Sequence, residues 1–335
     1  MATLILTQPE IRALLPMREC MDLVAEALAG LARGEAENPL RRAMKLADGR
    51  SLLGMMPGSL RSPPALGLKV VTVFPGNHGT PYDSHQGVVV LFDAGNGVPR
   101  AILDASEVTS IRTAATSGVA TRLLAREDAG DLAILGTGVE ARTHLEAMIC
   151  ARRIRRVRAF SPNRASREAF AGRASERHAI RVEAADSARA AVEGADIVCT
   201  TTSSSMPVLE GAWLAPGAHV NAVGACFRDA RELDTAAVVR ARLFVDRRES
   251  ALNEAGDFLI PQREGAIGED HIQGELGQVI AGRIAGRRSP GEITLFKSLG
   301  IAVEDLAAAW HLDRRAREQG VGTLVELGGR RDETA

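Results

Sequence analysis

Two short stretches combine residue types that could carry out chemistry. In "GLKVV" (67–71), Lys69 interrupts an otherwise apolar run. Burying an ammonium group is costly unless it is used, and burial with nearby cations lowers its pKa enough for proton transfer near neutral pH. The alternative is that Lys69 lies on an edge strand and its amine reaches water. In "LAILGTGVEA" (132–141), two glycines separate an apolar strand from a helix.

The glycine stretch has the spacing of a dinucleotide-binding turn. Gly136 permits a tight turn, Gly138 has no Cβ to obstruct a pyrophosphate, and the small Ala141 lets the helix lie close to the sheet. The free N–H groups at the start of that helix would then face the phosphates. An ordinary strand-to-helix loop remains the alternative interpretation.

The end of the next strand bears on which dinucleotide is preferred. NAD enzymes commonly have an acid there, which binds the ribose hydroxyls. This chain instead has Ser161, Asn163 and Arg164 in "FSPNR". Because an acid would repel a 2′-phosphate whereas Arg164 could pair with one, the sequence favours NADP(H), with NAD(H) possible. Alternatively, Arg164 is only the exposed start of a helix.

The pattern of expected secondary structure around these residues changes near residue 110. The first part predicts a helix over 17–33 and a mostly antiparallel sheet, with a hairpin at "DAGNG" (93–97). From there on, strand and helix patterns alternate, with strands expected at 132–136, 156–161, 180–184, 195–202, 218–224, 241–246 and 292–298. Alternation of this kind indicates right-handed crossovers and a parallel sheet. The expected fold class is α/β, with a Rossmann-type doubly wound parallel sheet domain plus an α+β domain.

Composition limits the classes of partner. A chain of 335 residues is long enough for two domains, and a net charge of −1 with 3% aromatic residues argues against nucleic acid and anionic membranes as partners. The histidines show no metal-ligand spacing, so we expect no metal. The N-terminus lacks the pattern of a signal peptide, and four scattered cysteines suit reduced thiols, so we expect a cytoplasmic protein.

Blocks along nearly the whole chain resemble the ornithine cyclodeaminase/mu-crystallin family. They include "PLR" (39–41), "GLKVVT" (67–72), "SHQGVVVLFD" (84–93), "IRTAA" (111–115), "ILGTGVEA" (134–141), "EAGD" (254–257), "GELGQVIAG" (274–282) and "TLFKSLGIAVEDLAAA" (294–309). The resemblance implies a homodimer and chemistry on small α-amino or α-imino acids with a nicotinamide cofactor. It also implies a substrate-binding and dimerisation domain of residues 1–112 with 303–330, a Rossmann domain of residues 113–302 between these parts, and a tail at 331–335.

The resemblance also assigns roles to particular residues. It places the substrate arginine at Arg41, whose guanidinium can hold an α-carboxylate with two parallel hydrogen bonds, although Arg42 is adjacent. Lys69 matches the catalytic lysine beside the imine or amine nitrogen, and Arg112 matches a second arginine near carboxylate and cofactor. Each arginine could instead be structural. The residues expected to bind the cofactor are Arg112, Thr113, Gly136, Thr137, Gly138, Val139, Glu140, Ser161, Asn163, Arg164, Thr201, Thr202, Val223 and Ser298.

The sequence departs from cyclodeaminases at "GACFRD" (224–229). Cyclodeaminases have a catalytic aspartate shortly after this strand, and the corresponding position here is Cys226, a substrate-site candidate. A thiol is a poor replacement for a carboxylate at neutral pH. Asp229 lies three residues later, in an unknown position. The departure favours plain hydride transfer over ring closure.

The sequence therefore predicts an NAD(P)H-dependent ketimine or imine reductase, or an amino-acid dehydrogenase in the reverse direction. Two alternatives stay open. One is an ornithine cyclodeaminase that uses NAD catalytically to make proline and ammonia. The other is a non-catalytic protein that keeps the dinucleotide site and binds a small ligand.

Overall fold

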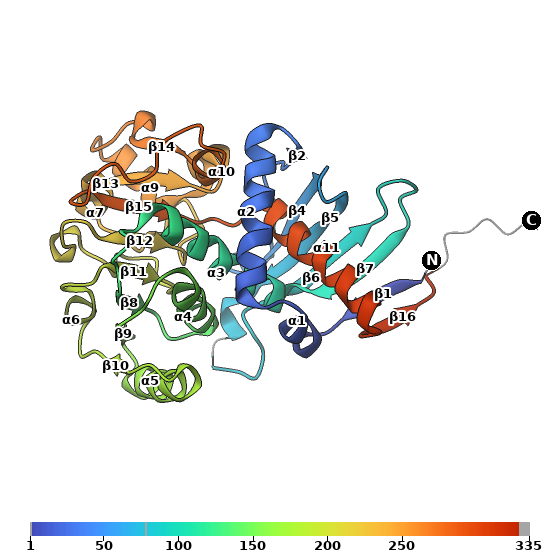
Figure 1. Cartoon of the computed structure of the whole chain (residues 1–335), viewed down its shortest axis with the longest axis horizontal. Helices are drawn as coiled ribbons and strands as arrows, with labels where there is room; N and C mark the ends of the chain where they lie inside the picture. The colour runs from blue at the N-terminus through green and yellow to red at the C-terminus, as the bar shows by residue number, and fades with distance from the viewer. Residues whose placement is uncertain (1, 78, 328–335) are drawn as a thin grey trace, which may run out of the picture. The chain divides into compact units, whose positions relative to one another are not determined.

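The computed structural model describes residues 2–77 and 79–327, and the chain divides into two compact units (Figure 1). Unit 1 consists of the residues up to Arg112 together with those from Ile301 on, and unit 2 consists of Thr113–Gly300. The expected tail at 331–335 and the last residues of the expected first domain, 328–330, lie outside the described residues.

Unit 1 is built on a mostly antiparallel sheet. Its strands are β1 (Thr3–Leu6), β2 (Ala36–Glu37), β3 (Arg42–Lys45), β4 (Leu52–Leu60), β5 (Ala65–Val73), β6 (His85–Phe92), β7 (Pro99–Asp104) and β16 (Thr323–Val325). Its helices are α1 (Gln8–Leu14), α2 (Met17–Arg33), the short 3-10 helix η1 (Pro75–Asn77) and α11 (Ala302–Gln319). The sheet order is β16-β1-β7-β6-β5-β4-β2, with β3 paired to β4. Strand β5 is therefore an interior strand, flanked by β4 and β6.

Helices α2 and α11 of unit 1 pack against each other, and α11 lies across β4, β5 and β6 (Figure 1). Met17, Met21, Val24 and Leu28 recur at helical spacing on the buried face of α2. The helix ends where Gly34 takes a left-handed conformation, with φ of 80°. The expected helix at 17–33 and the hairpin of β6 and β7 are both present.

Unit 2 is built on a sheet whose eight strands are all parallel. Its strands are β8 (Asp131–Leu135), β9 (Arg156–Phe160), β10 (Val182–Ala184), β11 (Ile197–Thr200), β12 (His219–Ala222), β13 (Ala241–Val245), β14 (Ile272–Glu275) and β15 (Ile293–Lys297). The helical segments are the last part of α3 (Ala105–Leu124), α4 (Val139–Ala151), α5 (Arg164–His178), α6 (Ala188–Val192), η2 (Gly211–Trp213), α7 (Thr235–Arg240), α8 (Arg248–Glu254), α9 (Gly256–Arg263), η3 (Glu269–His271) and α10 (Leu276–Ile280). The strand order is β10-β9-β8-β11-β12-β15-β13-β14.

Helices cover both faces of this parallel sheet. On one face, Ala133 and Leu135 of β8 pack in a cluster with Val192 of α6 and Phe258 of α9. On the other face, the Asn221 side chain donates a hydrogen bond from Nδ2 to Thr121 Oγ1 of α3, 3.0 Å away. Burial on both faces explains why β8 is a continuous apolar run. The predicted Rossmann-type α/β fold with a second α+β unit is confirmed.

The structure also differs in detail from the expected elements. Strand β10 begins at Val182 rather than residue 180, and β11 ends at Thr200 rather than residue 202. Strands β1, β14 and β16 are short, and their sequences lack the strong patterns that would reveal them. Within the described ranges, no helix has the length and apolar character needed to cross a membrane.

Candidate functional site

Lys69 lies on the interior strand β5, opposite Met56 of β4 and Val89 of β6, and is only 3% exposed. The alternative of an edge strand with an amine in water is therefore wrong. Its ammonium Nζ is 2.9 Å from Asp305 Oδ2 and donates a hydrogen bond to Thr109 Oγ1, 3.3 Å away. Burial and the Arg112 cation lower the pKa of Lys69 to about 8, while Asp305 acts in the opposite direction.

Two acids from the first turn of α11 hold Arg112 in the same cluster. The Arg112 guanidinium lies 2.8 Å from Asp305 Oδ1 through Nε and 2.6 Å from Glu304 Oε2 through Nη1. Arg112, Glu304 and Asp305 are all at most 3% exposed. Asp305 therefore binds Lys69 and Arg112 together, and two of the nitrogens of Arg112 are already committed to carboxylates.

Arg41 adds a third cation to this group. It lies just before β3, is half-buried, and is near enough to Lys69 to lower the pKa of the ammonium further. Arg42, its neighbour, is exposed on β3. Arg41 is thus a third cation near Lys69 and Arg112, which contact the carboxylates of Glu304 and Asp305. A guanidinium in such a group can bind an anionic group such as an α-carboxylate.

His85 and Gln86 lie at the start of β6 and are exposed. Part of the His85 residue is exposed, but the protein atoms around its ring, followed by the Lys69 ammonium, lower the pKa of His85. The Ser84 hydroxyl oxygen Oγ lies 3.0 Å from Nδ1 of His85. The Lys69 ammonium thus disfavours the charged form of His85.

In unit 2, the glycine turn has the geometry that its spacing predicts. Gly136 follows β8 with a φ of 111°, and a Cβ there would lie 2.6 Å from the carbonyl oxygen of Thr201. Only glycine fits both conditions. Gly138 is the residue before the first turn of α4, and a Cβ there would meet no atom within 4 Å. Ala141 is fully buried against the sheet.

The three remaining expected residues of this turn lie around the helix start. Val139 is 51% exposed, and Thr137 and Glu140 are half-buried. Thr113, another expected cofactor residue, is buried in α3. The residues present fit a dinucleotide pyrophosphate, because the N-terminus of α4 directly follows Gly138, where there is open space beside the backbone.

The segment after β9 has no acid near the strand end. Asn163 caps α5, since its Oδ1 accepts a hydrogen bond from the Ser166 N–H at 2.9 Å, and Ser161 is half-buried. Arg164 is exposed and pairs with Glu168, with Nε 2.7 Å from Oε1. An exposed pair of this kind contributes little energy, so Arg164 can reorient at small cost.

The other expected cofactor residues lie at the carboxyl ends of β11, β12 and β15. Thr201 donates a hydrogen bond from Oγ1 to the Leu135 carbonyl at 3.1 Å, and Thr202 donates to Glu232. Val223 is 6% exposed. Ser298 is 1% exposed, and its Oγ has no hydrogen-bond partner among the described residues. In open α/β sheets, ligands bind at this edge.

Cys226 is half-buried three residues after Val223, and its thiol donates a weak hydrogen bond to the Val223 carbonyl, 3.5 Å away. Asp229 instead points to solvent, with its carboxyl side chain 75% exposed and 3.3 Å from Arg263 Nη1. The structure therefore keeps the thiol, and not this carboxylate, near the strand ends.

Sequence reasoning missed several buried charges. They are Glu304 and Asp305 beside Lys69, and Glu232, Asp257 and Lys297 in unit 2. Lys297 gave the same signal as Lys69, since it follows the apolar run "TLF", but only Lys69 was singled out. The acids gave no local signal, because their partners are far away in the sequence.

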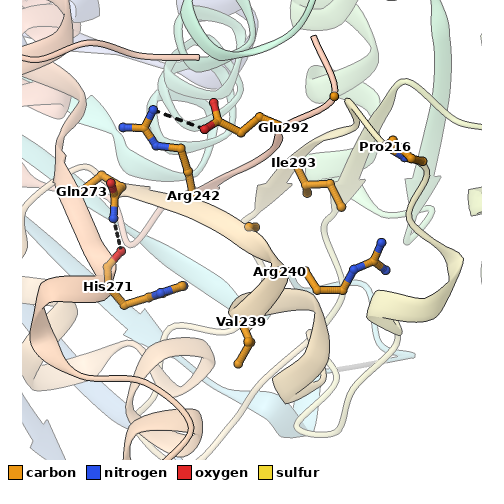
Figure 2. Close-up of a pocket in the computed structure, with 10 residues that line it drawn as sticks. Pro216, Val239, Arg240, Arg242, His271, Gln273, Glu292 and Ile293 are labelled. Atoms are coloured by element: carbon orange, nitrogen blue, oxygen red, sulfur yellow. Dashed lines mark hydrogen bonds and ion pairs between the residues drawn. The ribbon is translucent and has the colours of Figure 1, made fainter. Parts of the chain in front are cut away.

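A separate cavity of about 510 Å³ lies at the opposite, amino-terminal edge of the unit 2 sheet. Ala241 and Ile293, the first residues of β13 and β15, line it together with His271 (Figure 2). Figure 2 also shows Arg242 directed toward Glu292, to which it is paired at 3.5 Å. None of the predicted site residues lines this cavity, so its size alone does not identify the functional site.

The sheet of unit 2, its glycine turn and the cation cluster of unit 1 define a two-unit protein with a Rossmann-type dinucleotide-binding fold. A family model for the ornithine cyclodeaminase/mu-crystallin family matches residues 1–320, and the chain belongs to this family. The mouse (Mus musculus) ketimine reductase mu-crystallin is 41% identical over 286 residues, covering 84% of this chain and 87% of that protein.

Two solved structures are similar over almost the whole chain. The Thermococcus litoralis Δ1-pyrroline-2-carboxylate reductase in complex with NADH and L-proline has a TM-score of 0.94 and 39% identity, covering 96% of this chain and 99% of that one. An archaeal alanine dehydrogenase dimer with bound NAD has a TM-score of 0.92 and 33% identity, covering 98% and 100%.

Proposed function

We propose that this protein is a nicotinamide-dependent oxidoreductase that interconverts a small α-imino acid, or ketimine, and the corresponding α-amino acid. Its relatives include reductases of cyclic imino acids and an alanine dehydrogenase. The observation that carries the proposal is Lys69, a buried ammonium group with a pKa of about 8 that is held by Asp305. A pKa close to the working pH suits a group that must give and take a proton.

In this proposal, different residues of unit 1 contact the carboxylate and the nitrogen of the substrate. The guanidinium groups of Arg41 and Arg112 bind the α-carboxylate. Lys69 donates a proton to the imine nitrogen during reduction and removes it during oxidation. A bound dinucleotide supplies the hydride that reduces Cα. One hydride at carbon and one proton at nitrogen convert the C=N bond into an amine.

The charge balance around Asp305 supports a reversible role for Lys69. Asp305 bonds to Lys69 and to Arg112, so its carboxylate keeps a cationic partner when Lys69 is neutral. Neutral Lys69 therefore does not leave an isolated buried charge behind. The cluster can hold either protonation state of the amine.

Cyclodeaminase activity is less well supported. Ring closure would need a base for the distal amine. The family resemblance matches the cyclodeaminase aspartate to Cys226, whose thiol is half-buried here. The carboxylate of Asp229 is exposed and paired with Arg263. We therefore propose net redox chemistry rather than loss of ammonia.

For the cofactor, we propose a preference for NADP(H), with NAD(H) also accepted. The end of β9 offers Ser161, Asn163 and Arg164 and no carboxylate that would repel a 2′-phosphate. Arg164 would have to leave Glu168 to pair with that phosphate, which the weak exposed pair permits.

We also propose that the protein is a homodimer formed through unit 1. The face of the sheet opposite α11 carries an unbroken apolar row across four strands, formed by Pro57, Leu68, Val90 and Ile102. In the neighbouring rows Met55, Leu66 and Val88 are each more than a third exposed. Such a patch suits a second copy of the same face, and the solved alanine dehydrogenase relative is itself a dimer.

The decisive experiment is a spectrophotometric screen with the full chain. Oxidation of NADPH and NADH is followed at 340 nm (from the absorbance of the reduced ring) with Δ1-pyrroline-2-carboxylate, Δ1-piperideine-2-carboxylate and an open-chain imino acid formed from pyruvate and ammonia. We expect turnover with at least one of them. Release of ammonia from L-ornithine without net NAD(P)H formation would instead support a cyclodeaminase, and tight cofactor binding without turnover would support a non-catalytic binder.

A further inference from the structure

Three buried charged residues of unit 2 take no part in the proposed proton transfer. Glu232 is 0% exposed, Asp257 is 2% exposed and Lys297 is 1% exposed. They lie at or next to the carboxyl ends of β11, β12 and β15. Buried charges are expensive, so their contacts indicate what they are used for.

The Glu232 carboxylate accepts four hydrogen bonds from two strand ends. Its Oε1 accepts from the Thr202 N–H and the Thr202 hydroxyl, both at 2.7 Å. Its Oε2 accepts from the Thr200 hydroxyl and from the Gly224 N–H, also both at 2.7 Å. One side chain thus ties the segment after β11 to the segment after β12.

Asp257 holds the backbone at Glu232 in place, and Lys297 in turn pairs with Asp257. Asp257 Oδ1 accepts hydrogen bonds from the backbone N–H groups of Glu232 at 2.8 Å and Leu233 at 3.0 Å. Its Oδ2 lies 3.0 Å from the Lys297 ammonium at the end of β15. Although burial acts to lower it, the nearby Asp257 carboxylate raises the pKa of Lys297, so this lysine stays a cation. The connected group therefore spans the ends of three neighbouring strands.

The place of this group in the sheet relates it to one half of a dinucleotide. Strand order reverses between β8 and β11, since β9 and β10 lie on one side of β8, and β11, β12 and β15 lie on the other. A dinucleotide binds across such a reversal, with one mononucleotide over each half. The glycine turn and the segment after β9 belong to the adenine half. Thr202, Val223 and Cys226 belong to the other half.

We propose that Glu232 is a positioning residue for the nicotinamide half of the cofactor, acting through Thr202 and Gly224. This inference rests on the proposed function. Glu232 fixes the spacing of the two strand ends that face the ring, and Asp257 and Lys297 fix Glu232. Within the described part of the chain, none of these three side chains forms a hydrogen bond with the glycine turn or with the segment after β9, so we expect loss of Glu232 to leave the adenine half in place.

The variant Glu232→Gln tests the point with little change in volume. One carboxylate oxygen becomes an NH₂ group, which then faces either the Thr202 N–H or the Gly224 N–H. Both of these backbone groups can only donate, so one of the two contacts is lost and its strand end must move. Thr200→Val is a milder variant that removes a single hydroxyl from the same carboxylate.

Thr294→Val is the matched control. Thr294 is a fully buried threonine of β15 near the opposite end of the strand. Its hydroxyl donates a hydrogen bond to the Leu124 carbonyl at 2.9 Å, accepts one from Arg287 Nη2 at 3.0 Å and lies 3.0 Å from His219 Nδ1. Thr200→Val and Thr294→Val therefore remove one buried hydroxyl each from the same sheet. Thermal unfolding of all variants reports any general loss of stability.

The experiment compares binding of NADH, NADPH and ADP-ribose by calorimetry, together with kcat and KM for imino-acid reduction. ADP-ribose keeps the adenine half and both phosphates but lacks the nicotinamide. For Glu232→Gln we expect NADH binding or kcat to fall about tenfold or more while ADP-ribose affinity stays within about twofold. Thr200→Val should show the same pattern more weakly, and Thr294→Val should not show it.

Equal weakening of NADH and ADP-ribose would mean that Glu232 has only a general structural role, and unchanged NADH binding and kcat would also overturn the inference. If Glu232→Gln does not fold, the comparison of Thr200→Val with Thr294→Val decides the matter in the same way. Absence of imino-acid turnover in the unsubstituted protein would count against the proposed function alone, because the contrast between NADH and ADP-ribose binding is measured without substrate.

Discussion

Replacing Lys69 with methionine should abolish most of the imino-acid reductase activity. Methionine keeps the apolar stem on the interior strand β5 and removes only the proton donor. Asp305 keeps its contact with Arg112, 2.8 Å away, so the cluster does not retain an unpaired carboxylate. General acid catalysis contributes about a hundredfold to ten-thousandfold, and we expect kcat to fall by that range.

The pH dependence gives a second, independent measure of the same residue. With a pKa of about 8, the ammonium form of Lys69 exceeds the neutral form about tenfold at pH 7, and the ratio is reversed at pH 9. Reduction needs the ammonium as acid, so kcat/KM should fall about tenfold from its plateau by pH 9. Oxidation of the amino acid needs the neutral amine as base, so its kcat/KM should rise through the same range.

Both quantities come from a single set of assays at 340 nm between pH 6 and 10, with Lys45→Met as a control lysine on the exposed strand β3. Lys69→Arg is informative as well, because arginine retains the charge but does not release its proton. If Lys69→Met retains more than about a third of the original kcat, the assignment of Lys69 as the proton donor is refuted.

The remaining predictions concern the carboxylate, the cofactor, stability and assembly. Arg41→Ala should raise the KM for the imino acid by about tenfold to a hundredfold with little change in NADPH affinity; if Arg42→Ala has that effect instead, the choice between the two arginines is wrong. Arg164→Ala should weaken NADPH binding by about tenfold and leave NADH binding unchanged in calorimetry; equal effects on both would remove Arg164 from the 2′-phosphate site. The pKa of Lys69 is lower in the folded protein than in the unfolded chain, so the unfolded chain binds more protons between about pH 8 and 10.5. The contribution of Lys69 to the free energy of unfolding should therefore increase by about 3 kcal/mol as pH rises through that window. Chemical denaturation of the protein and of Lys69→Met at pH 7 and pH 10 measures this change, and a stability difference that is the same at both pH values would contradict the lowered pKa. Val88→Lys places a charge on the exposed apolar face of unit 1 and should yield monomers in light scattering, whereas a dimer that survives this change would locate the subunit interface elsewhere.

The local sequence pattern was enough to predict the elements whose apolar residues or glycines follow a regular spacing. The apolar run of β8, the glycine turn with Ala141 and the amphipathic helix α2 each carry their signal within about fifteen residues, and each is present. The burial of Lys69 also followed from its apolar neighbours. In these places local preference and the final fold agree, which is why the sequence alone was informative.

The partners of these residues could not be predicted, because they depend on contacts between distant parts of the chain. Lys69 and Asp305 are separated by 236 positions, and Thr200 and Glu232 by 32. A carboxylate at the start of a helix, such as Asp305, normally indicates only a favourable interaction with the helix dipole. Only the packing of α11 on the sheet reveals that Asp305 compensates two buried cations.

The location of the acids in α11 has a consequence for synthesis of the chain. Lys69 and Arg112 emerge from the ribosome long before Glu304 and Asp305, and synthesis proceeds from the N-terminus. A nascent chain that lacks α11 therefore holds two cations that cannot be buried without their counter-charges. Unit 1 can therefore complete its native interior only after α11 has been synthesised, and we expect a product truncated before residue 304 to be degraded rather than to act as a smaller enzyme.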